Sequence, residues 1–285
     1  MTPHTTDRRK PRIALMGEFS AGKSTLANLL LEQNTSPVQA TATQLPPVWY
    51  SLGAPGAERR RRDGAREPIP IDEWAESGMD GTRTISVNLE ADFLETADLI
   101  DMPGTSDPNM EEAYWEEVLP QVDLVIWCTP ANQAWRQSEA ALWESMPPAL
   151  WARSLLLVTR IDQVPEDIDR RRILARVRKE AGAQFAKVLP IALPQAFAGR
   201  EDREVQIASG AAAMMEYLEA ALAEIMAASD PAQLRTDPAA PSPQTVEAMA
   251  TDGAAPAVKI VPRRVTPRRR TRRRTEAQPA ALSLG

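Results

Sequence analysis

The chain has 285 residues, 43% of them hydrophobic, and carries 33 Lys and Arg against 39 Asp and Glu. Its one histidine, His4, and its one cysteine, Cys128, exclude histidine catalysis, a zinc site and an internal disulfide. No apolar stretch approaches the roughly 20 residues of a membrane helix, and residues 1–10 read as a flexible leader without the apolar segment of a secretory signal. The composition predicts a soluble cytoplasmic protein in which Cys128 is a buried, inert thiol.

A phosphate-binding loop is the first strong feature of the chain. Residues 17 to 24 read Gly-Glu-Phe-Ser-Ala-Gly-Lys-Ser, a complete G-x-x-x-x-G-K-S between a predicted strand and a predicted helix. Gly17 and Gly22 let the backbone wrap around phosphate oxygens, so that N–H groups meet negative charge. Lys23 would reach the β- and γ-phosphates, and the Ser24 hydroxyl would ligate Mg²⁺. We expect nucleotide contacts from Gly17, Glu18, Phe19, Ser20, Ala21, Gly22, Lys23, Ser24 and Thr25.

Apolar runs alternate with helical patterns up to about residue 229. A polar stretch between residues 53 and 70, with four arginines at 59–62, predicts an inserted loop whose arginines are solvated rather than bound to a ligand. Strands are predicted at residues 13–16, 48–52, 85–91, 97–101, 123–129, 154–159 and 187–191, and helices at 23–33, 109–119, 133–144, 167–181 and 210–228. The alternation predicts an α/β fold, a P-loop three-layer sandwich with a mostly parallel sheet of about six strands, in a domain of residues 11–229.

Two further motifs, each at the end of a predicted strand, indicate which base is bound. In the D-x-x-G that begins at Asp101, the carboxylate can hold the Mg²⁺ shell through water, and the Gly104 N–H can sense the γ-phosphate. In the T-R-x-D that ends at Asp162, the carboxylate can accept hydrogen bonds from both the N1–H and the exocyclic amine of guanine. Adenine does not offer this pair of donors. The Arg160 stem would pack over the base plane, and Thr159 would brace the loop.

The composition changes after residue 229. Residues 230–258 are rich in Ala, Pro, Thr and Asp without periodicity, which predicts a disordered tail. Residues 262–275 then contain eight arginines and no aromatic residue. Such a run can attract anionic lipid or nucleic acid electrostatically, or it is a solvated tail without a dedicated partner.

The three motifs together resemble those of the dynamin superfamily of GTPases, and of bacterial dynamin-like proteins in particular, over about residues 11–228. The resemblance rests on residues 17–25 as the phosphate loop, 101–104 as the D-x-P-G switch, 158–162 as the guanine motif and 129–132 as a segment that follows a central strand. It implies a GTPase domain with Mg²⁺, low nucleotide affinity, hydrolysis stimulated by G-domain dimerisation and, often, membrane remodelling. The long helical stalk of dynamins has no evident counterpart, so fission by a helical coat is not expected.

Two positions depart from related enzymes. Phe19 occupies the place of the catalytic glutamine of eukaryotic dynamins, and Thr105 the place where Ras-like enzymes carry theirs. Thr43 is the first choice for the Mg²⁺-binding threonine of switch I, and Thr41 the second, because both precede the entry to the next strand as the family's threonine does. Hydrolysis would then rest on Mg²⁺, Lys23, Ser20, the backbone donor of Gly104 and Thr43.

We therefore predict Mg²⁺-dependent binding of GTP and its hydrolysis to GDP and phosphate. The alternative is a GTP-binding module with negligible turnover that docks a partner. This alternative stays open because Phe19 and Thr105 stand where related enzymes carry a glutamine. A P-loop kinase is disfavoured by the guanine motif. Expected partners are GTP and GDP, a second G domain in a homodimer and, through the arginine-rich tail, an anionic membrane surface or nucleic acid, with the protein cytoplasmic or peripheral at the membrane.

Overall fold

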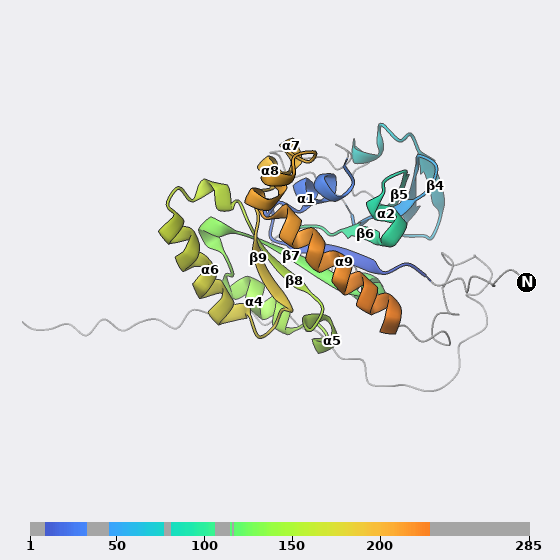
Figure 1. The fold of residues 1–285 in the computed structure, drawn as a ribbon. Coiled ribbons are helices and arrows are strands. Elements are labelled where there is room, and N and C mark those ends of the chain that lie inside the picture. Colours follow the sequence, from blue (N-terminus) through green and yellow to red (C-terminus); the bar gives the residue numbers. More distant parts are fainter. Residues whose placement is uncertain (1–8, 33–45, 77–80, 106–114, 116, 229–285) are drawn as a thin grey trace, which may run out of the picture. The chain divides into compact units, whose positions relative to one another are not determined.

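A nine-stranded sheet organises the residues that the structure describes. The computed structural model describes residues 9–32, 46–76, 81–105, 115 and 117–228, and the strands lie in the order β4-β3-β5-β2-β6-β1-β7-β8-β9 (Figure 1). The strands are β1 (Arg12–Gly17), β2 (Val48–Leu52), β3 (Gly56–Arg61), β4 (Arg66–Ile69), β5 (Thr82–Leu89), β6 (Asp98–Asp101), β7 (Leu124–Pro130), β8 (Leu155–Thr159) and β9 (Lys187–Pro190).

The prediction of a mostly parallel sheet is confirmed, although the sheet has more strands than the expected six. Neighbouring strands are parallel except in the pairs β2–β6, β3–β4 and β3–β5. The central strands are continuous apolar runs, as expected for parallel strands that are covered on both faces. In β1, Ile13 to Met16 are fully buried.

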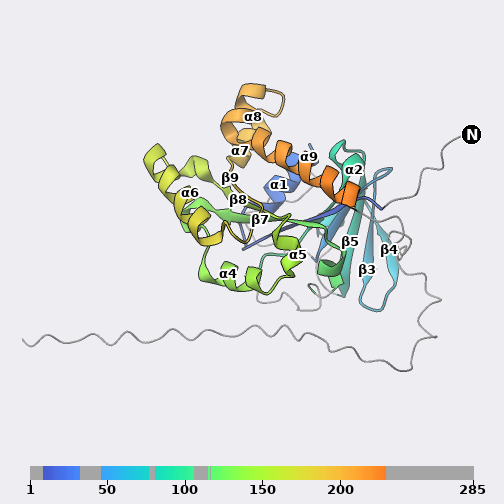
Figure 2. The ribbon, with the colours of Figure 1, turned by 60° about the horizontal axis from the view of Figure 1, so that its bottom comes forward.

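Helices cover both faces of the sheet, which gives the predicted three layers (Figures 1 and 2). Ile13 and Leu15 pack in a core with α1, α7 and α9, whereas Ala14 and Met16 pack in a second core with α4, α5 and α6. The helices are α1 (Lys23–Leu30), α2 (Phe93–Thr96), α4 (Gln137–Glu144), α5 (Pro148–Trp151), α6 (Asp167–Ala181), α7 (Leu193–Ala198), α8 (Arg203–Ser209) and α9 (Ala211–Ala228).

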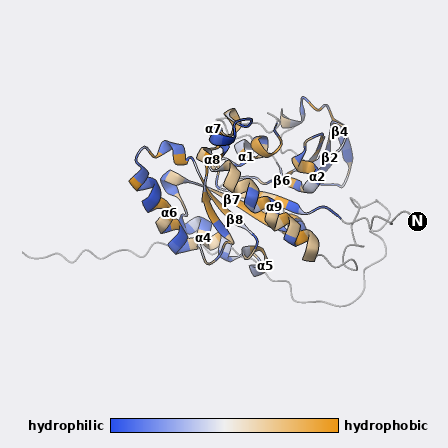
Figure 3. Cartoon of the chain, in the orientation of Figure 1, coloured by the Kyte–Doolittle hydropathy of each residue, from blue (hydrophilic) through white to orange (hydrophobic). Residues whose placement is uncertain are grey.

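The two long helices have the bounds that their sequence patterns predict, within one residue. Helix α6 is mostly hydrophilic (Figure 3), and it packs on the sheet through a short apolar stripe that includes the buried Val177 and Ala181. Acidic residues in its first turn and basic residues in its last turn complement the helix dipole. No helix in the described ranges is both long and apolar enough to cross a membrane.

The predicted loop between residues 53 and 70 is wrong, because β3 and β4 form an antiparallel hairpin there that extends the sheet beyond β5. Its arginines are ion-paired rather than merely solvated: Arg59 lies opposite Glu67 across the hairpin, and its Nε donates to that carboxylate at 2.6 Å. Arg61 contacts the same carboxylate at 3.1 Å. The turn contains Gly64 in the left-handed region (φ 88°) directly after Asp63, a common hairpin signal.

Other boundaries differ for local reasons. The helix predicted at 133–144 begins only at Gln137, because a 3₁₀ turn (Ala131–Gln133) and a left-handed Trp135 precede it. The short helices α2, α5, α7 and α8 were not predicted, since each is too short for a clear periodic pattern. Most of the helix predicted at 109–119, the leader up to residue 8 with His4, and the tail from residue 229 lie outside the described residues.

Candidate functional site

All three sequence motifs lie at one edge of the sheet. Strands β1, β6, β7 and β8 run parallel and end near Gly17, Asp101, Pro130 and Thr159. The order of connections reverses at β1, since the chain goes from β1 to strands on one side and returns through β7 on the other. Ligands of open α/β sheets bind in the crevice at such a carboxyl-end reversal.

The phosphate loop starts where β1 passes closest to β7. Gly17 has φ 135°, and a Cβ there would lie 2.1 Å from the Cys128 carbonyl oxygen, so the position accepts only glycine. Helix α1 begins at Lys23, whose side chain is 8% exposed. The Lys23 ammonium donates to the carbonyls of Gly17 at 3.1 Å and Glu18 at 2.9 Å. Burial lowers the pKa of Lys23, and the charge of Asp101 opposes this shift.

Ser24 and Asp101 come together as the magnesium prediction requires. The Ser24 hydroxyl donates to the Asp101 carboxylate at 3.2 Å. A hydroxyl and a carboxylate are hard oxygen donors, which Mg²⁺ prefers, and this ion usually takes only one or two protein ligands beside phosphates and water. Within the described ranges no group of three or more His, Cys, Asp and Glu could hold a metal. Thr43 and Thr41 lie outside those ranges.

The D-x-P-G segment rests directly on the phosphate loop. The Thr105 N–H donates to the Gly17 carbonyl at 3.1 Å, so the segment continues the contact between β6 and β1. A Cβ on Gly104 would lie 2.9 Å from the backbone nitrogen of Phe19. Gly104 is therefore required for this close approach, which brings its backbone beside the loop.

The T-R-x-D loop also contacts the phosphate loop. The buried Thr159 hydroxyl donates to the Ala21 carbonyl at 2.7 Å, which fits the bracing role expected of it. Arg160 has a left-handed backbone (φ 55°), and its guanidinium donates to the Ser20 carbonyl at 2.7 Å. Asp162 Oδ1 is buried and has no hydrogen-bond partner among the described residues. A buried acceptor of this kind fits a ligand that brings its own donors, as guanine does.

Sequence reasoning missed a contact between the phosphate loop and the start of α4. One carboxylate oxygen of Glu18 accepts from Arg136 at 2.7 Å, and the other accepts from the Ser138 hydroxyl at 3.0 Å. The residue before, Trp135, is buried in the left-handed region (φ 58°), which costs a non-glycine residue about 1–3 kcal/mol. The only signal for this region was the resemblance of residues 129–132 to a dynamin segment.

A buried carboxylate holds the backbone of this segment. Glu139 is 1% exposed and accepts hydrogen bonds from Trp127 Nε1 at 2.9 Å, Thr129 Oγ1 at 3.0 Å and the Arg136 N–H at 2.9 Å. Burial raises the pKa of Glu139, and these three hydrogen bonds oppose the shift. The Thr129 hydroxyl in turn accepts from the Trp135 N–H at 2.9 Å. The segment is thus fixed by a fully bonded polar network inside the protein.

The loop after β9 was missed as well. The Ile161 N–H points to the Ile191 carbonyl at 3.5 Å, and the side chain of Leu193 would lie 3.0 Å from a Cβ placed on Gly22. The start of α7 therefore packs against both the phosphate loop and the T-R-x-D loop. Its position at the carboxyl end of a parallel strand is the signal that would have found it.

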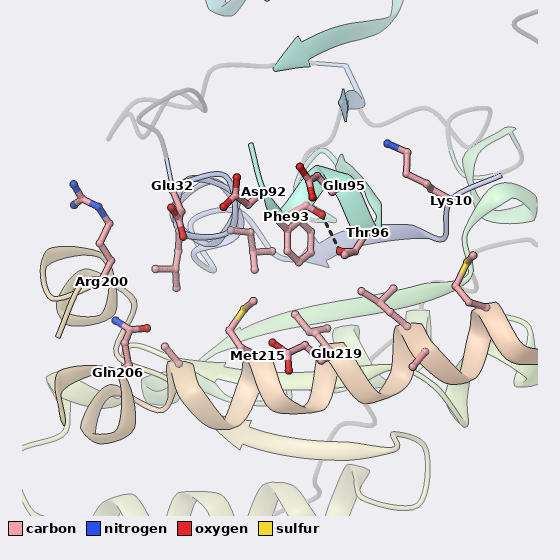
Figure 4. A pocket seen from close by; sticks show the side chains of 17 residues that line it. Lys10, Glu32, Asp92, Phe93, Glu95, Thr96, Arg200, Gln206, Met215 and Glu219 are labelled. Atoms are coloured by element: carbon pink, nitrogen blue, oxygen red, sulfur yellow. Dashed lines mark hydrogen bonds between the residues drawn. The ribbon is translucent and has the colours of Figure 1, made fainter. Parts of the chain in front are cut away.

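A second concave region lies away from these motifs. A groove of about 600 Å³ runs between α9 on one side and the end of α1 with α2 on the other (Figure 4). Phe93 and Met215 line it from facing elements, and four carboxylates lie around it, from Glu32, Asp92, Glu95 and Glu219. None of the predicted site residues lines this groove, so it is not the nucleotide site.

Comparisons with known proteins agree with the motifs. The family model for the Dynamin family matches residues 13–160, which is 148 of the 285 residues and just over half of the chain. The isoniazid-induced protein IniC of Mycobacterium tuberculosis is 34% identical over 103 residues, which cover 33% of this chain and 21% of IniC. A second strain of the same organism gives the same match.

Solved structures show the same fold. An oligomerised bacterial dynamin pair, described as a mechanism for long-range sensing and tethering of membranes, is similar with a TM-score of 0.61 and 17% identity. The alignment covers 75% of this chain and 38% of that chain. A second structure of such a pair gives a TM-score of 0.60 and 17% identity, and covers 74% of this chain and 37% of that one. The chain thus spans well under half of the length of these relatives.

Thr159 provides a test of how the two loops are joined. Thr159→Val keeps the shape but leaves the Ala21 carbonyl without its donor, so the free energy of unfolding should fall by about 1–3 kcal/mol. Urea unfolding measures the loss. Thr159→Ser retains the hydroxyl and is the matched control, expected to keep most of the stability. A loss of stability in Thr159→Ser but not in Thr159→Val would show that the methyl group, rather than the hydrogen bond, matters.

Proposed function

Because this chain belongs to the dynamin family of GTPases, we propose that it binds GTP together with Mg²⁺ and hydrolyses it to GDP and phosphate. The observation that carries the proposal is the meeting of three motifs at one sheet edge. The hydroxyl of Ser24 bonds to Asp101, and the hydroxyl of Thr159 bonds to the phosphate loop. The buried, unpartnered Oδ1 of Asp162 supports recognition of a base with hydrogen-bond donors.

Different residues at this edge would bind the phosphates and Mg²⁺. Backbone N–H groups of the loop and the N-terminus of α1 receive the phosphates. Lys23, whose ammonium is directed into the loop, turns to the β- and γ-phosphate oxygens. Ser24, Asp101 and Thr43 would hold Mg²⁺, with Ser20 and the Gly104 N–H beside the γ-phosphate. Bound Mg²⁺ supplies charge neutralisation across the β- and γ-oxygens.

Assembly belongs to the proposal as well. A second G domain facing the nucleotide edge would complete a site that has neither a glutamine at position 19 nor one at position 105. Phe19 supports such a contact, since its side chain is 47% exposed at that edge. The same exposed residue also suits the alternative function, a GTP-binding module with negligible turnover that docks a partner.

The tail supports a peripheral site of action. Residues 263–274 hold eight arginines without an apolar anchor, so their attraction to an anionic surface is electrostatic. The bacterial dynamin pair with a similar fold is described as sensing and tethering membranes. We infer that this chain is cytoplasmic and contacts anionic lipid through the tail, and nucleic acid is the competing ligand.

Asp162 tests the choice of base. Asp162→Asn places an amide donor opposite the guanine amine, so GTP affinity should fall roughly tenfold or more, since a charge-assisted pair contributes about 1.5–3 kcal/mol. The same variant should gain affinity for xanthosine triphosphate, whose exocyclic oxygen accepts from the new amide. Titration with fluorescent nucleotides measures both constants. Equal competition by ATP and GTP in the wild type would contradict the guanine assignment.

Protein concentration separates hydrolysis from simple binding. Specific GTPase activity should be low in dilute protein and should rise across a hundredfold range of concentration as G domains pair. Lys23→Ala, which removes the cation facing the β/γ-phosphates, should bring turnover to background without unfolding the chain. Activity that stays near background at every concentration, with GTP bound and the protein monomeric, would favour the binding module.

The tail is tested by salt and truncation. Vesicles containing anionic lipid should sediment with the protein at low salt and release it by a few hundred millimolar, because the Debye length is about 8 Å at physiological salt. Deleting residues 259–285 should abolish this binding and leave GTP turnover by the free protein unchanged. Neutral vesicles and an RNA homopolymer are the comparison ligands. Lipid binding that survives the deletion would mean that another part of the chain makes the contact.

A further inference from the structure

Arg136 is a cation at the phosphate loop for which the proposed function has no role so far. Among the described residues, three cationic side chains hydrogen-bond to this loop: Lys23, Arg160 and Arg136. In the proposed function, Lys23 binds phosphate oxygens, and Arg160 belongs to the loop expected to bind the base. Arg136 bonds to the loop through the Glu18 carboxylate, and the carbonyl oxygen of Glu18 lies 2.9 Å from Lys23 Nζ. Arg136 and the ammonium that would face the β- and γ-phosphates thus both bond to Glu18, one at its carboxylate and the other at its carbonyl.

The backbone of Arg136 is fixed while its side chain keeps freedom. Its N–H is held by the buried Glu139 at 2.9 Å, and the preceding Trp135 is locked in a left-handed conformation by burial and by its bond to Thr129. The Arg136 side chain, in contrast, is 42% exposed. Strained backbone that the surrounding structure holds in place is typical of functional positions.

Glu18 orients the Arg136 guanidinium but accepts a hydrogen bond from only one of its nitrogen atoms. Only Nη1 of Arg136 donates to the Glu18 carboxylate, and the other N–H groups of the guanidinium have no partner among the described residues. Ser138 bonds to the second oxygen of Glu18 and so fixes the carboxylate. A guanidinium carries five donors in a planar fork, so it can keep this bond and still donate to phosphate oxygens.

We propose that Arg136 is a catalytic arginine acting in cis, which donates to oxygens of the β- and γ-phosphates as GTP is cleaved. This inference rests on the proposed function. In the reaction, water adds to the γ-phosphorus while the bond from that phosphorus to the bridging oxygen breaks, and the electron pair of that bond stays on GDP. One proton of the water remains on the released hydrogen phosphate, and the other goes to solvent. Negative charge grows on the bridging oxygen, where an arginine stabilises it.

The first experiment compares single-turnover GTP hydrolysis, with Mg²⁺, by the wild type and variants of the full chain. The rate constant of Arg136→Ala should fall about 100-fold to 1000-fold. Arg136→Lys should recover only part of the rate, because a point charge cannot reproduce the planar fork. Arg172→Ala removes an exposed arginine of α6 that pairs with Asp169, and as the matched control it should behave like the wild type.

Binding measurements separate a catalytic from a structural role. Dissociation constants for GTP and GDP should change by less than about threefold in Arg136→Ala, because the arginine acts on charge that develops in the transition state. The wild type should bind GDP with aluminium fluoride more tightly than GDP alone, and Arg136→Ala should lose this gain. An equal loss of GDP affinity and of rate would overturn the proposal, since it would indicate a distorted loop.

A double variant excludes the simpler explanation that Arg136 only neutralises Glu18. If neutralisation were its role, Glu18→Gln combined with Arg136→Ala would regain the wild-type rate, and the proposal would fall. A catalytic Arg136 keeps the double variant as slow as Arg136→Ala. Mixing Arg136→Ala with Lys23→Ala protein tests action in trans, because the second protein still carries Arg136. Recovery of turnover in the mixture would overturn action in cis.

Turnover by the wild type distinguishes a failure of the proposed GTP hydrolysis from a failure of the role proposed for Arg136. GTP binding without turnover in the wild type would contradict the proposed hydrolysis, and this inference with it. Wild-type turnover that persists undiminished in Arg136→Ala would overturn only the role of Arg136 and leave the GTPase function intact.

Discussion

The contact between Gly17 and the Cys128 carbonyl sets the geometry on which the rest of the structure depends. The register that pairs β1 with β7 runs to Gly17 opposite Cys128, and there the chain turns into the phosphate loop. A side chain at position 17 would collide with β7, so this close approach exists only because the residue is glycine. Cys128 is fully buried on the β7 side of the contact, and burial raises the pKa of its thiol to about 12, as expected of an inert residue.

From this point, three separate parts of the chain are tied to one loop. Thr105 bonds to the Gly17 carbonyl, Thr159 bonds to the Ala21 carbonyl, and Arg136 bonds to the Glu18 side chain. The first is a backbone–backbone bond just after β6, and the second joins the Thr159 hydroxyl at the end of β8 to a backbone carbonyl, so the sheet itself positions both. The third depends on side chains and follows a strained turn at Trp135, so the sheet positions it less directly.

Much of the site could be predicted because its chemistry is local in sequence. The phosphate loop, the D-x-P-G segment and the T-R-x-D segment each require particular residues at fixed spacing, and each follows an apolar strand. Arg136 could not be found in this way, since it is 118 residues from Glu18 and no motif marks it. Thr43 shows a different limit: its predicted role depends on aligning a loop without internal landmarks, and the residue lies outside the described ranges.

In the fold, too, some elements follow from local sequence and others do not. Central strands such as β1 and β8 are continuous apolar runs, so their existence follows from the sequence. The hairpin of β3 and β4 was missed because its side chains are mostly charged: Arg59 and Arg61 on one strand bond to Glu67 on the other, and only Ala57 of β3 is buried. Hydrophobic periodicity cannot detect a strand that has one buried side chain and charged neighbours across the hairpin.

The two outermost strands also determine how copies of this protein can meet. An uncovered sheet edge is a template for another strand, and proteins commonly block it with proline and charge. Strand β4 carries Arg66 and Pro68, and strand β9, at the other end, carries Lys187 and Pro190. Neither edge therefore invites a continuous intermolecular sheet. Self-association through these two edges is disfavoured, so contacts between copies would use side-chain surfaces, which separate more readily than paired backbones.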